Sequence, residues 1–402
     1  MKILGFNIGG AKEQPPIQET PIIEKSIFNG RKVTNFNFQS DNKYLPSDYN
    51  NLYSSTYVRY GADNLFPVKL MDFYNSAPIH KSCVDLKTRL LFGDGIQIAD
   101  GSNKVSTEVF LNNIDGYNNI DTLFNQIALD YILFGNYYLI ATWNESFTKI
   151  IKVERLPAFG TRLKWNPMNN KPIGVVYNFD WKYKPNTYVE YPVFNVLDKN
   201  NRQQVIIGIN NTLDSSVYNF PTYISGLNSI ASNGAIGLFQ LNTIENGFFP
   251  SVGIHYYGEP TPEEEDSIHY NLTKQFGGKR NSGKFLLFFD ASPELKTTVE
   301  PIDQPNLDKT FTVIEESIQN NIIFAHGIVS PILVGISKAG SLGNNNELQN
   351  AFMLMEKMKV NAERKQIEST LNKILAINGM SSIEVKTLII FEEQNNVKQL
   401  NS

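Results

Sequence analysis

Hydrophobic residues recur every three or four positions along much of this chain, and that spacing predicts amphipathic helices. A short helix is predicted at residues 65–73, and a longer one runs from Pro78 to a stop at Gly93. Further helices are expected at residues 119–135, 220–246, 262–276, 303–328 and 344–378. The last of these carries its apolar stripe on residues such as Met355, Met358 and Ile367.

Runs rich in aromatic and β-branched residues predict strands. They lie at residues 136–143, 149–157, 173–179, 187–197, 203–209, 251–257, 285–290 and 382–392. Because strands and helices do not alternate regularly, the pattern favours the α+β class. Residues 1–45 show no periodicity and are rich in proline and charge, so we expect an extended arm there.

The helix predicted at residues 220–246 is almost free of charge, because no charged residue occurs between Pro221 and Glu245. Such a helix must be covered on more than one side, and a second chain is a natural source of that cover. We therefore predict a subunit interface on the apolar stripes of this helix and of the helix at 303–328. The predicted interface residues are Leu227, Ile230, Leu238, Leu241, Phe311, Ile314 and Ile318.

Composition narrows the classes of function. The 402 residues are 41% hydrophobic and 19% charged, which is typical of a folded protein. The net charge of −4 argues against tight binding of duplex nucleic acid through a basic face. The single cysteine, Cys83, excludes an intramolecular disulfide framework, argues against a cysteine-rich zinc site and is expected to be buried or inert. No apolar run approaches the ~20 residues that span a bilayer, and no cleavable signal opens the chain, so we expect an intracellular or viral protein.

One stretch imitates a nucleotide-binding loop. Gly278, Gly283 and Lys284 satisfy the G-x-x-x-x-G-K spacing, but Phe285 stands where the motif needs Ser or Thr to hold magnesium. A phosphate loop also leads from a strand into a helix N-terminus, whereas this stretch is expected to lead from a helix into a strand. Asp290 follows too soon to lie on a separate strand. We therefore predict a basic turn.

The sequence contains no catalytic or metal-binding constellation that can be singled out. The four histidines lack metal-ligand spacing, and a place at the surface or at a helix end is expected for His80, His255, His269 and His326. The acidic run Glu263–Asp266 is typical of a solvated helix start, with a charged docking patch as the alternative. We expect a non-enzymatic protein that binds no metal and no cofactor.

In the order of its parts, the chain resembles a portal protein of tailed double-stranded DNA bacteriophages, the ring through which DNA enters and leaves the capsid. The resemblance spans residues 57–391 and is most specific in three stretches. They are YGADNLFP with SAPIHKSCVDLKTRLLFGDG, from Tyr60; LFNQIALDYILFGNYYLI, from Leu123; and the segment from Asp303 to Leu375.

The resemblance implies an α+β, portal-like fold with an α/β wing, two stem helices, a small α/β clip and a tunnel loop. The implied parts are an arm (1–45), the wing (46–219), a first stem helix (220–246), the clip (247–302), a second stem helix (303–328), the tunnel loop (329–346), and a long wing helix with a short C-terminal strand (347–402). Few residues follow the last helix, so only a reduced crown is expected.

The resemblance also implies a function. The expected assembly is a homo-oligomeric ring, a dodecamer, that forms the channel for genome packaging, retention and ejection and joins head to tail. The implied partners are double-stranded DNA bound without sequence preference, the terminase large subunit, a neck adaptor, and the major capsid protein with its scaffold. The implied location is the portal vertex of a virion assembled in the host cytoplasm, with no membrane.

Three groups of residues take roles by this resemblance. Tunnel-loop residues are expected to line the channel without holding phosphate tightly: Ser337, Lys338, Ser341, Asn344, Asn345 and Asn346. At least one of Glu315 and Glu316 is expected to face the channel and repel phosphate. The clip is expected to dock the packaging motor and the adaptor through Glu263, Glu264, Glu265, Lys279, Arg280 and Lys284.

Two other functions stay open at this point. One is a DNA-packaging ATPase built around Gly278–Lys284, and the other is a capsid or tail structural protein without DNA contact. ATP hydrolysis by the purified protein separates the first from a portal. Paired long helices that flank a small α/β unit speak against the second.

Overall fold

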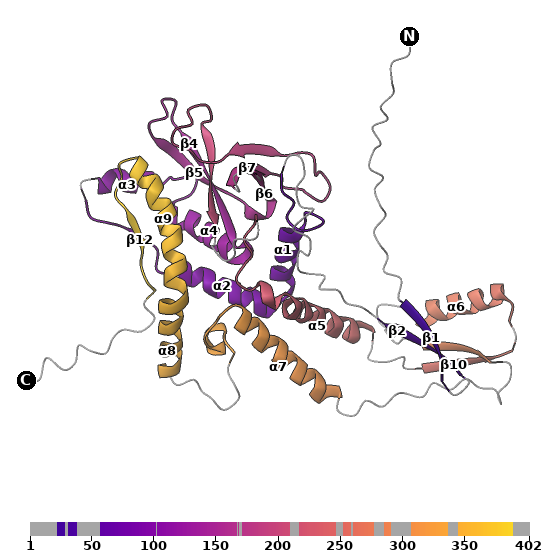
Figure 1. Ribbon diagram of the computed structural model, residues 1–402. Helices are drawn as coiled ribbons and strands as arrows, with labels where there is room; N and C mark the ends of the chain where they lie inside the picture. The colour runs from indigo at the N-terminus through magenta and orange to yellow at the C-terminus, as the bar shows by residue number, and fades with distance from the viewer. Residues whose placement is uncertain are drawn as a thin grey trace, which may run out of the picture. The chain divides into compact units, whose positions relative to one another are not determined.

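The computed structural model describes residues 22–28, 31–37, 57–101, 103–166, 168, 171–209, 217–246, 252–258, 260–276, 285–290, 307–336 and 345–388. The chain divides into two compact units, Met1–Tyr44 and Leu45–Ser402. Figure 1 labels the helices and strands of both units.

The first unit contains a β-hairpin where the sequence predicted an extended arm. Strands β1 (Ile22–Phe28) and β2 (Arg31–Asn37) pair antiparallel, with Phe28 opposite Arg31. In the sequence, Asn29 and Gly30 separate the two strands, and Asn-Gly between strand-forming runs is a strong signal for a two-residue hairpin. Within the predicted arm, these two segments therefore form a hairpin instead of an extended chain.

Three helices form much of the core of the second unit: α1 (Phe66–Ser76), α2 (Pro78–Phe92) and α4 (Ile120–Phe134). Proline occupies an early position in α1 and α2, where its missing N–H costs nothing. Helix α4 begins where the side chain of Asn119 accepts a hydrogen bond from the Thr122 N–H at 3.0 Å. It ends at Gly135, whose φ of 74° and close approach to the Phe220 backbone both require glycine.

Two three-stranded antiparallel sheets complete this core. Strand β4 (Asn136–Trp143) follows α4 directly and lies between β5 (Ile150–Leu156) and β9 (Gln203–Ile209). Helix α4 contacts β4 and β5 as well as α2, so it is covered from two sides (Figure 1). The second sheet consists of β6 (Thr161–Asn166), β7 (Lys171–Tyr177) and β8 (Val189–Pro192).

The C-terminal part of the chain returns to the first helices. Strand β12 (Ile383–Val385) pairs with β3 (Ile96–Ile98), which α3 (Lys104–Leu111) contacts. A long helical segment precedes β12 and consists of α8 (Asn345–Met355), the π-helix η6 (Glu356–Val360) and α9 (Asn361–Ile377). The described residues also include the short 3₁₀-helices η2 (Ala158–Gly160), η3 (Ile224–Gly226) and η5 (Pro331–Val334).

Helices α5 (Leu227–Asn246) and α7 (Leu307–Ala325) pack against each other. Between them in the sequence come β10 (Val252–Tyr257), α6 (Pro262–Phe276) and β11 (Phe285–Asp290), and the two strands pair in parallel. Within the described parts of the chain, no helix has the length and hydropathy needed to cross a membrane.

Candidate functional site

The helix pair α5 and α7 is anchored in the core at one end. Gly226 lies so close to α7 that a Cβ there would stand 2.6 Å from the Cβ of Ala325. Ile230 in α5 and Ile322 in α7 are fully buried. Both helices contact α2, and α5 also contacts α1. The chain itself therefore holds this end of the pair.

Farther along the two helices, large apolar side chains face solvent. Leu238 and Leu241 of α5 are 61% and 51% exposed, and Val313 and Ile314 of α7 are 65% and 43% exposed. These four residues are called the outer apolar surface below. Exposed apolar groups of this size on neighbouring elements are typical of a surface that binds a partner.

The predicted interface residues divide between these two ends. Leu227 and Ile230 are 2% and 0% exposed, so their prediction as interface residues was wrong: α1 and α2 cover the start of α5. Leu238, Leu241 and Ile314 belong to the outer apolar surface. Ile318 is half-buried, and the side chain of Phe311 lies outside the described residues.

The two glutamates of α7 are both exposed but differ in their surroundings. The Oε1 atom of Glu315 accepts a hydrogen bond from Nε2 of Gln240 at 2.8 Å, which ties α7 to α5. Glu316, the next residue, lies about 100° farther around the helix axis. Glu316 is therefore the better candidate of the two for a face that is turned away from α5.

The predicted tunnel loop is described in part. Residues Pro331–Val334 form η5, which ends at Gly335 with a φ of 78°. Helix α8 begins at Asn345, as the helix predicted from residue 344 leads one to expect. Asn345 and Asn346 therefore belong to this helix and not to the tunnel loop in which the resemblance placed them. Ser337, Lys338, Ser341 and Asn344 lie outside the described residues.

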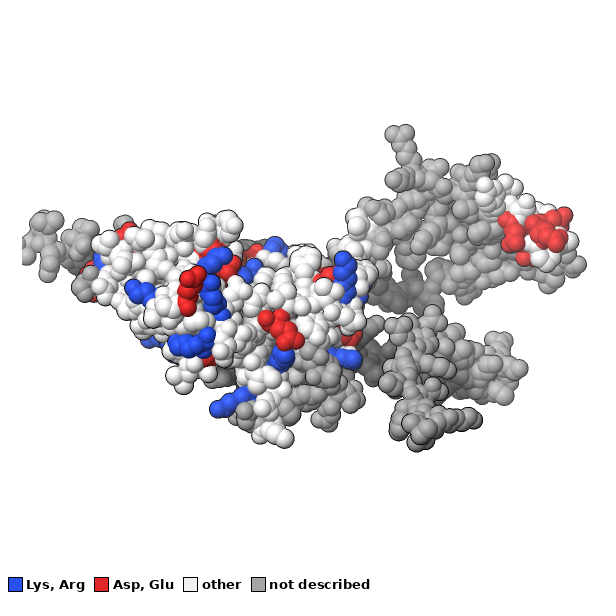
Figure 2. All heavy atoms as spheres, turned by 90° about the horizontal axis from the view of Figure 1, so that it is seen from above, with Lys and Arg blue, Asp and Glu red and all other residues white. Residues whose placement is uncertain are grey.

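The acidic run of the predicted clip is a solvent-exposed helix start. Glu263, Glu264 and Glu265 occupy the first turn of α6 and are exposed. Figure 2 shows the acidic start of α6 as the red cluster at its right-hand side. The Thr261 N–H donates to Oε2 of Glu264 at 2.9 Å, and the Glu264 N–H donates to Oγ1 of Thr261 at 3.4 Å. This is a capping box, which stabilises the helix N-terminus together with the negative charges. Lys279, Arg280 and Lys284 lie outside the described residues.

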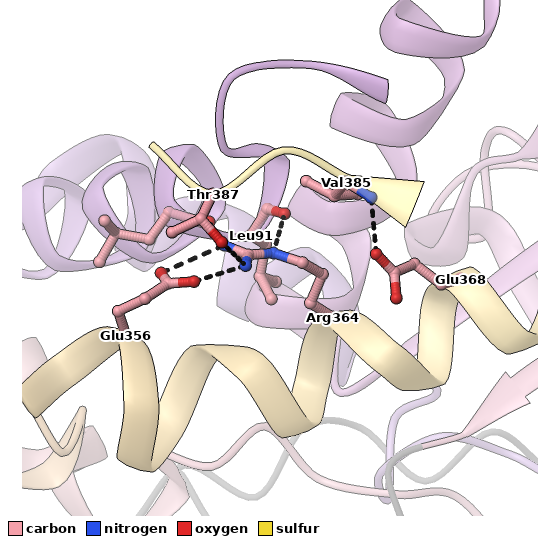
Figure 3. A network of polar contacts seen from close by, with 7 residues as sticks. Leu91, Glu356, Arg364, Glu368, Val385 and Thr387 are labelled. Atoms are coloured by element: carbon pink, nitrogen blue, oxygen red, sulfur yellow. Dashed lines mark hydrogen bonds and ion pairs between the residues drawn. The ribbon is translucent and has the colours of Figure 1, made fainter. Parts of the chain in front are cut away.

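A buried arginine connects α9 to the end of α2 (Figure 3). The guanidinium of Arg364 donates to the carbonyls of Leu90 and Leu91 at 2.6 and 3.1 Å, which are among the last carbonyls of α2. It also pairs with both carboxylate oxygens of Glu356, at 2.5 and 3.1 Å. Helix-terminal carbonyls lack partners within their own helix, and a cation there also favours the helix dipole. Arg364 thus caps α2 from a segment more than 270 residues away.

The π-helix η6 brings Glu356 and Arg364 to one face. In a regular α-helix, residues eight apart point ~80° away from each other. The wider turn of a π-helix reduces the rotation per residue and removes this difference. It also shifts the apolar stripe, so that Val360 is fully buried whereas Met358, predicted in the stripe, is 64% exposed.

The two histidines whose side chains are described, and the cysteine, take structural places. His80 in the first turn of α2 and His326 directly after α7 both lie at helix ends, as expected, but they are buried and not at the surface. The side chains of His255 and His269 lie outside the described residues. Cys83 is buried, and burial raises the pKa of its thiol to about 12, so the thiol is inert. Among the described residues, no three His, Cys, Asp or Glu side chains come together to hold a metal.

A probable portal protein of Escherichia phage P2 is 24% identical to this chain over 272 residues, which cover 65% of the chain and 68% of that protein. This similarity confirms the resemblance to phage portal proteins that the sequence predicted. No protein-family model matches it.

Solved structures share the fold. A chain in the virion of a native gene transfer agent particle matches with a TM-score of 0.54 and 16% identity, over 82% of this chain and 84% of that one. A chain in the neck of the native particle, computed with C12 symmetry, matches with a TM-score of 0.51 and 16% identity, over 80% and 83% of the two chains. The predicted class, α+β and portal-like, is confirmed.

Replacing Arg364 with Met is expected to leave the buried Glu356 carboxylate without its ion-pair partner and two α2 carbonyls without their hydrogen-bond donor. The free energy of unfolding should fall by about 3–5 kcal/mol, measured by chemical denaturation. The exposed neighbour is the control: Lys365→Met should change it by less than about 0.5 kcal/mol. Adding Glu356→Gln to Arg364→Met removes the unpaired buried charge and should recover part of the lost free energy of unfolding. Equal losses for Arg364→Met and Lys365→Met would contradict the capping role.

Proposed function

We propose that this chain is the structural subunit of a portal ring. The ring forms the channel at the capsid vertex of a phage-like particle, through which double-stranded DNA is packaged, retained and ejected, and on which head and tail are joined. The observation that carries the proposal is the similarity to a phage portal protein together with the outer apolar surface on α5 and α7. The subunit acts as a conduit and not as an enzyme.

Ring formation explains the exposed apolar residues. A head-to-tail interface between identical chains closes into a ring when the rotation between neighbours closes. The outer apolar surface is one face of that interface, and the next subunit covers it. Dodecameric symmetry is supported by the C12 symmetry of the neck whose chain shares this fold. Electron microscopy of the purified protein, with the mass of the particle in solution, tests this: rings with a central hole are expected, and a monomer at all concentrations would refute the proposal.

The ATPase alternative finds no support in the described residues. The sequence Gly278–Lys284 follows α6 and precedes β11, so it leads from a helix into a strand. The N–H groups that hold phosphate belong at the start of a helix, not at its end. A capsid or tail protein without DNA contact is distinguished from a portal by the DNA content of particles.

Two matched substitutions to aspartate test which end of α5 belongs to the interface. Leu238→Asp places a charge on the outer apolar surface and is expected to abolish rings while leaving the subunit folded, because the side chain is 61% exposed. Ile230→Asp places the same charge in the chain's own core and should cost the folded subunit about 3–5 kcal/mol. Size-exclusion chromatography and thermal unfolding of both variants separate the two effects. Normal rings from Leu238→Asp would contradict the interface.

We also propose that the channel is lined by the loop residues Ser337, Lys338, Ser341 and Asn344 and by Glu316, with Glu315 held toward α5 by Gln240. Weakly charged loops and acidic walls keep a polyanion moving, since tight phosphate neutralisation would hold it in place.

Deleting Ser337–Gly343, or replacing Glu316 with Lys, should therefore leave rings intact and lower the DNA content of assembled particles. Glu315→Lys is the comparison for the second variant, and it should have the smaller effect. The DNA content is read by quantifying packaged genome against wild-type particles. Full particles from both the deletion and Glu316→Lys would remove the channel assignment.

The clip is proposed to dock the terminase large subunit and later the neck adaptor through its charges, Glu263–Glu265 on one side and Lys279, Arg280 and Lys284 on the other. Charge-based docking depends on salt. Lys279→Glu with Arg280→Glu should weaken terminase capture by the ring at least ~10-fold at low salt, which corresponds to the ~1.4 kcal/mol of a single good charge contact. Glu263→Lys with Glu265→Lys probes the acidic side and spares the Thr261–Glu264 capping box. Full-strength capture by both double variants would exclude these charges as the docking surface.

A further inference from the structure

Three rings form a buried cluster where α7 ends against α2. His80 lies in the first turn of α2, and His326 directly follows α7; they are 0% and 2% exposed. Nδ1 of His80 and Nε2 of His326 are 2.9 Å apart, which is hydrogen-bond distance. Tyr223 packs against both imidazoles, with ring centroids 4.6 Å from each. We call these three residues the histidine cluster.

The cluster connects elements that are far apart in the sequence. The Tyr223 hydroxyl donates to the carbonyl of Leu133 near the end of α4, at 2.6 Å. The two histidines are 246 residues apart and join α2 to the end of α7. The same end of α7 packs against Gly226 of η3 through Ala325. The histidine cluster is therefore part of the joint between the core and the α5–α7 pair.

A count of hydrogens shows that the pair fits its place only when both rings are neutral. Two neutral imidazoles carry two N–H groups: one lies in the shared hydrogen bond, and the other stands on an outer nitrogen. The outer nitrogens, Nε2 of His80 and Nδ1 of His326, have no hydrogen-bond partner among the described residues. Each added proton creates another buried N–H without an acceptor, as well as a buried charge.

The charged and titratable groups around the cluster do not compensate that charge. Lys87 of α2 is buried and contributes a positive charge that disfavours a charged His326. The Nζ atom of Lys87 lies 3.7 Å from Oε1 of Glu363 in α9, so this carboxylate is already paired with the lysine. From η6, Lys359 approaches Gly327, the residue after His326. Only Asp85 of α2 favours a charged His80, and this carboxylate is engaged by Tyr74 at 2.6 Å and Lys81 at 3.5 Å.

The phenol of Tyr223 carries no negative charge that could offset a positive imidazole, and neither does that of Tyr131 in α4, which lies beside Glu363. Both phenols stay protonated, because burial raises the pKa of each. The negative end of the α7 dipole favours a cation at His326. Burial opposes it and lowers the pKa of His80 to about 4 and that of His326 well below its ordinary value.

We propose that the histidine cluster is a proton-sensitive latch that holds the end of α7 against α2 while both imidazoles are neutral and releases it when they take up protons. The release is local, because the rings lie at the joint and not in the β4–β5 part of the core. It concerns the single chain and does not depend on ring formation.

The direction of the pH response follows from the neutral state of the closed latch. With the latch open, each imidazole regains its ordinary pKa near 6.5 and binds a proton below that pH, whereas the closed latch excludes it. The closed state is therefore fully favoured above about pH 6.5, and its stability relative to the open state decreases as the pH falls toward about 4. In that window the population of the open state should rise up to ~10-fold per pH unit for each histidine.

Hydrogen exchange of the full-length protein between pH 7.5 and 5 tests the latch, with each rate divided by the intrinsic exchange rate at that pH. Amides at the end of α7 (residues 320–328) should lose protection as the pH falls, while those of β4 (residues 138–142) should not. In the double variant His80→Gln with His326→Gln, the α7 amides should keep one level of protection over this range. His269→Gln, which removes a histidine of α6, should behave like the wild type.

A wild-type measurement decides the matter if the double variant does not fold. Nuclear magnetic resonance of histidine labelled in the imidazole ring should show His80 and His326 neutral at pH 6, and protonated only over the range in which the α7 end loses protection. The proposal fails if either ring titrates near pH 6.5 while that protection stays constant. It fails equally if a folded double variant retains the wild-type pH response.

Discussion

The burial of helix α2 is the constraint on which the second unit depends. This helix contacts α1, α4, α5, α7 and α9, and its inner face carries polar groups as well as apolar ones. A buried polar group without a partner costs about 1–3 kcal/mol. Lys87, 3% exposed, is satisfied by Thr222 at 3.3 Å and Glu363 at 3.7 Å, and the last carbonyls of α2 are satisfied by Arg364. The partners come from distant segments, so α2 can be completed only when the whole unit is folded.

This constraint also places the α5–α7 pair. The buried ends of both helices belong to the packing around α2, while the outer apolar surface has no cover of that kind. The pair is thus firmly held at one end and offers exposed apolar side chains at the other. A subunit built this way can fold before it assembles, because the residues that hold the joint are separate from those that remain for a neighbour. The proposed ring needs that separation, since its subunits must be correctly folded before the interface closes.

Helices, strands and fold class could be predicted from the sequence because their signals are local. The strand predicted from the aromatic-rich run at 136–143 and the helix stop predicted at Gly135 appear directly in the structure. The buried polar network could not be predicted this way, because a charged residue in a helix usually faces solvent. Arg364 stands at stripe spacing before Ile367 and Leu371, which was a usable signal, but its partner Glu356 is aligned only by the π-helix. A π-helix depends on tertiary contacts, so no local sequence pattern predicts it.

The same reasoning explains why the candidate surfaces were harder to assign than the fold. A stripe of apolar residues shows that a helix is covered, but not by which chain. Ile230 and Leu238 were predicted on one stripe and are chemically similar, yet the first is buried by α1 and α2 and the second is exposed. What separates them is how far the packing of α1 and α2 extends along α5. Gly234, whose Cβ would lie 3.2 Å from Oγ of Ser76 at the end of α1, shows that this packing still reaches that turn. Beyond it the helix leaves the core, and its apolar residues become available to another molecule.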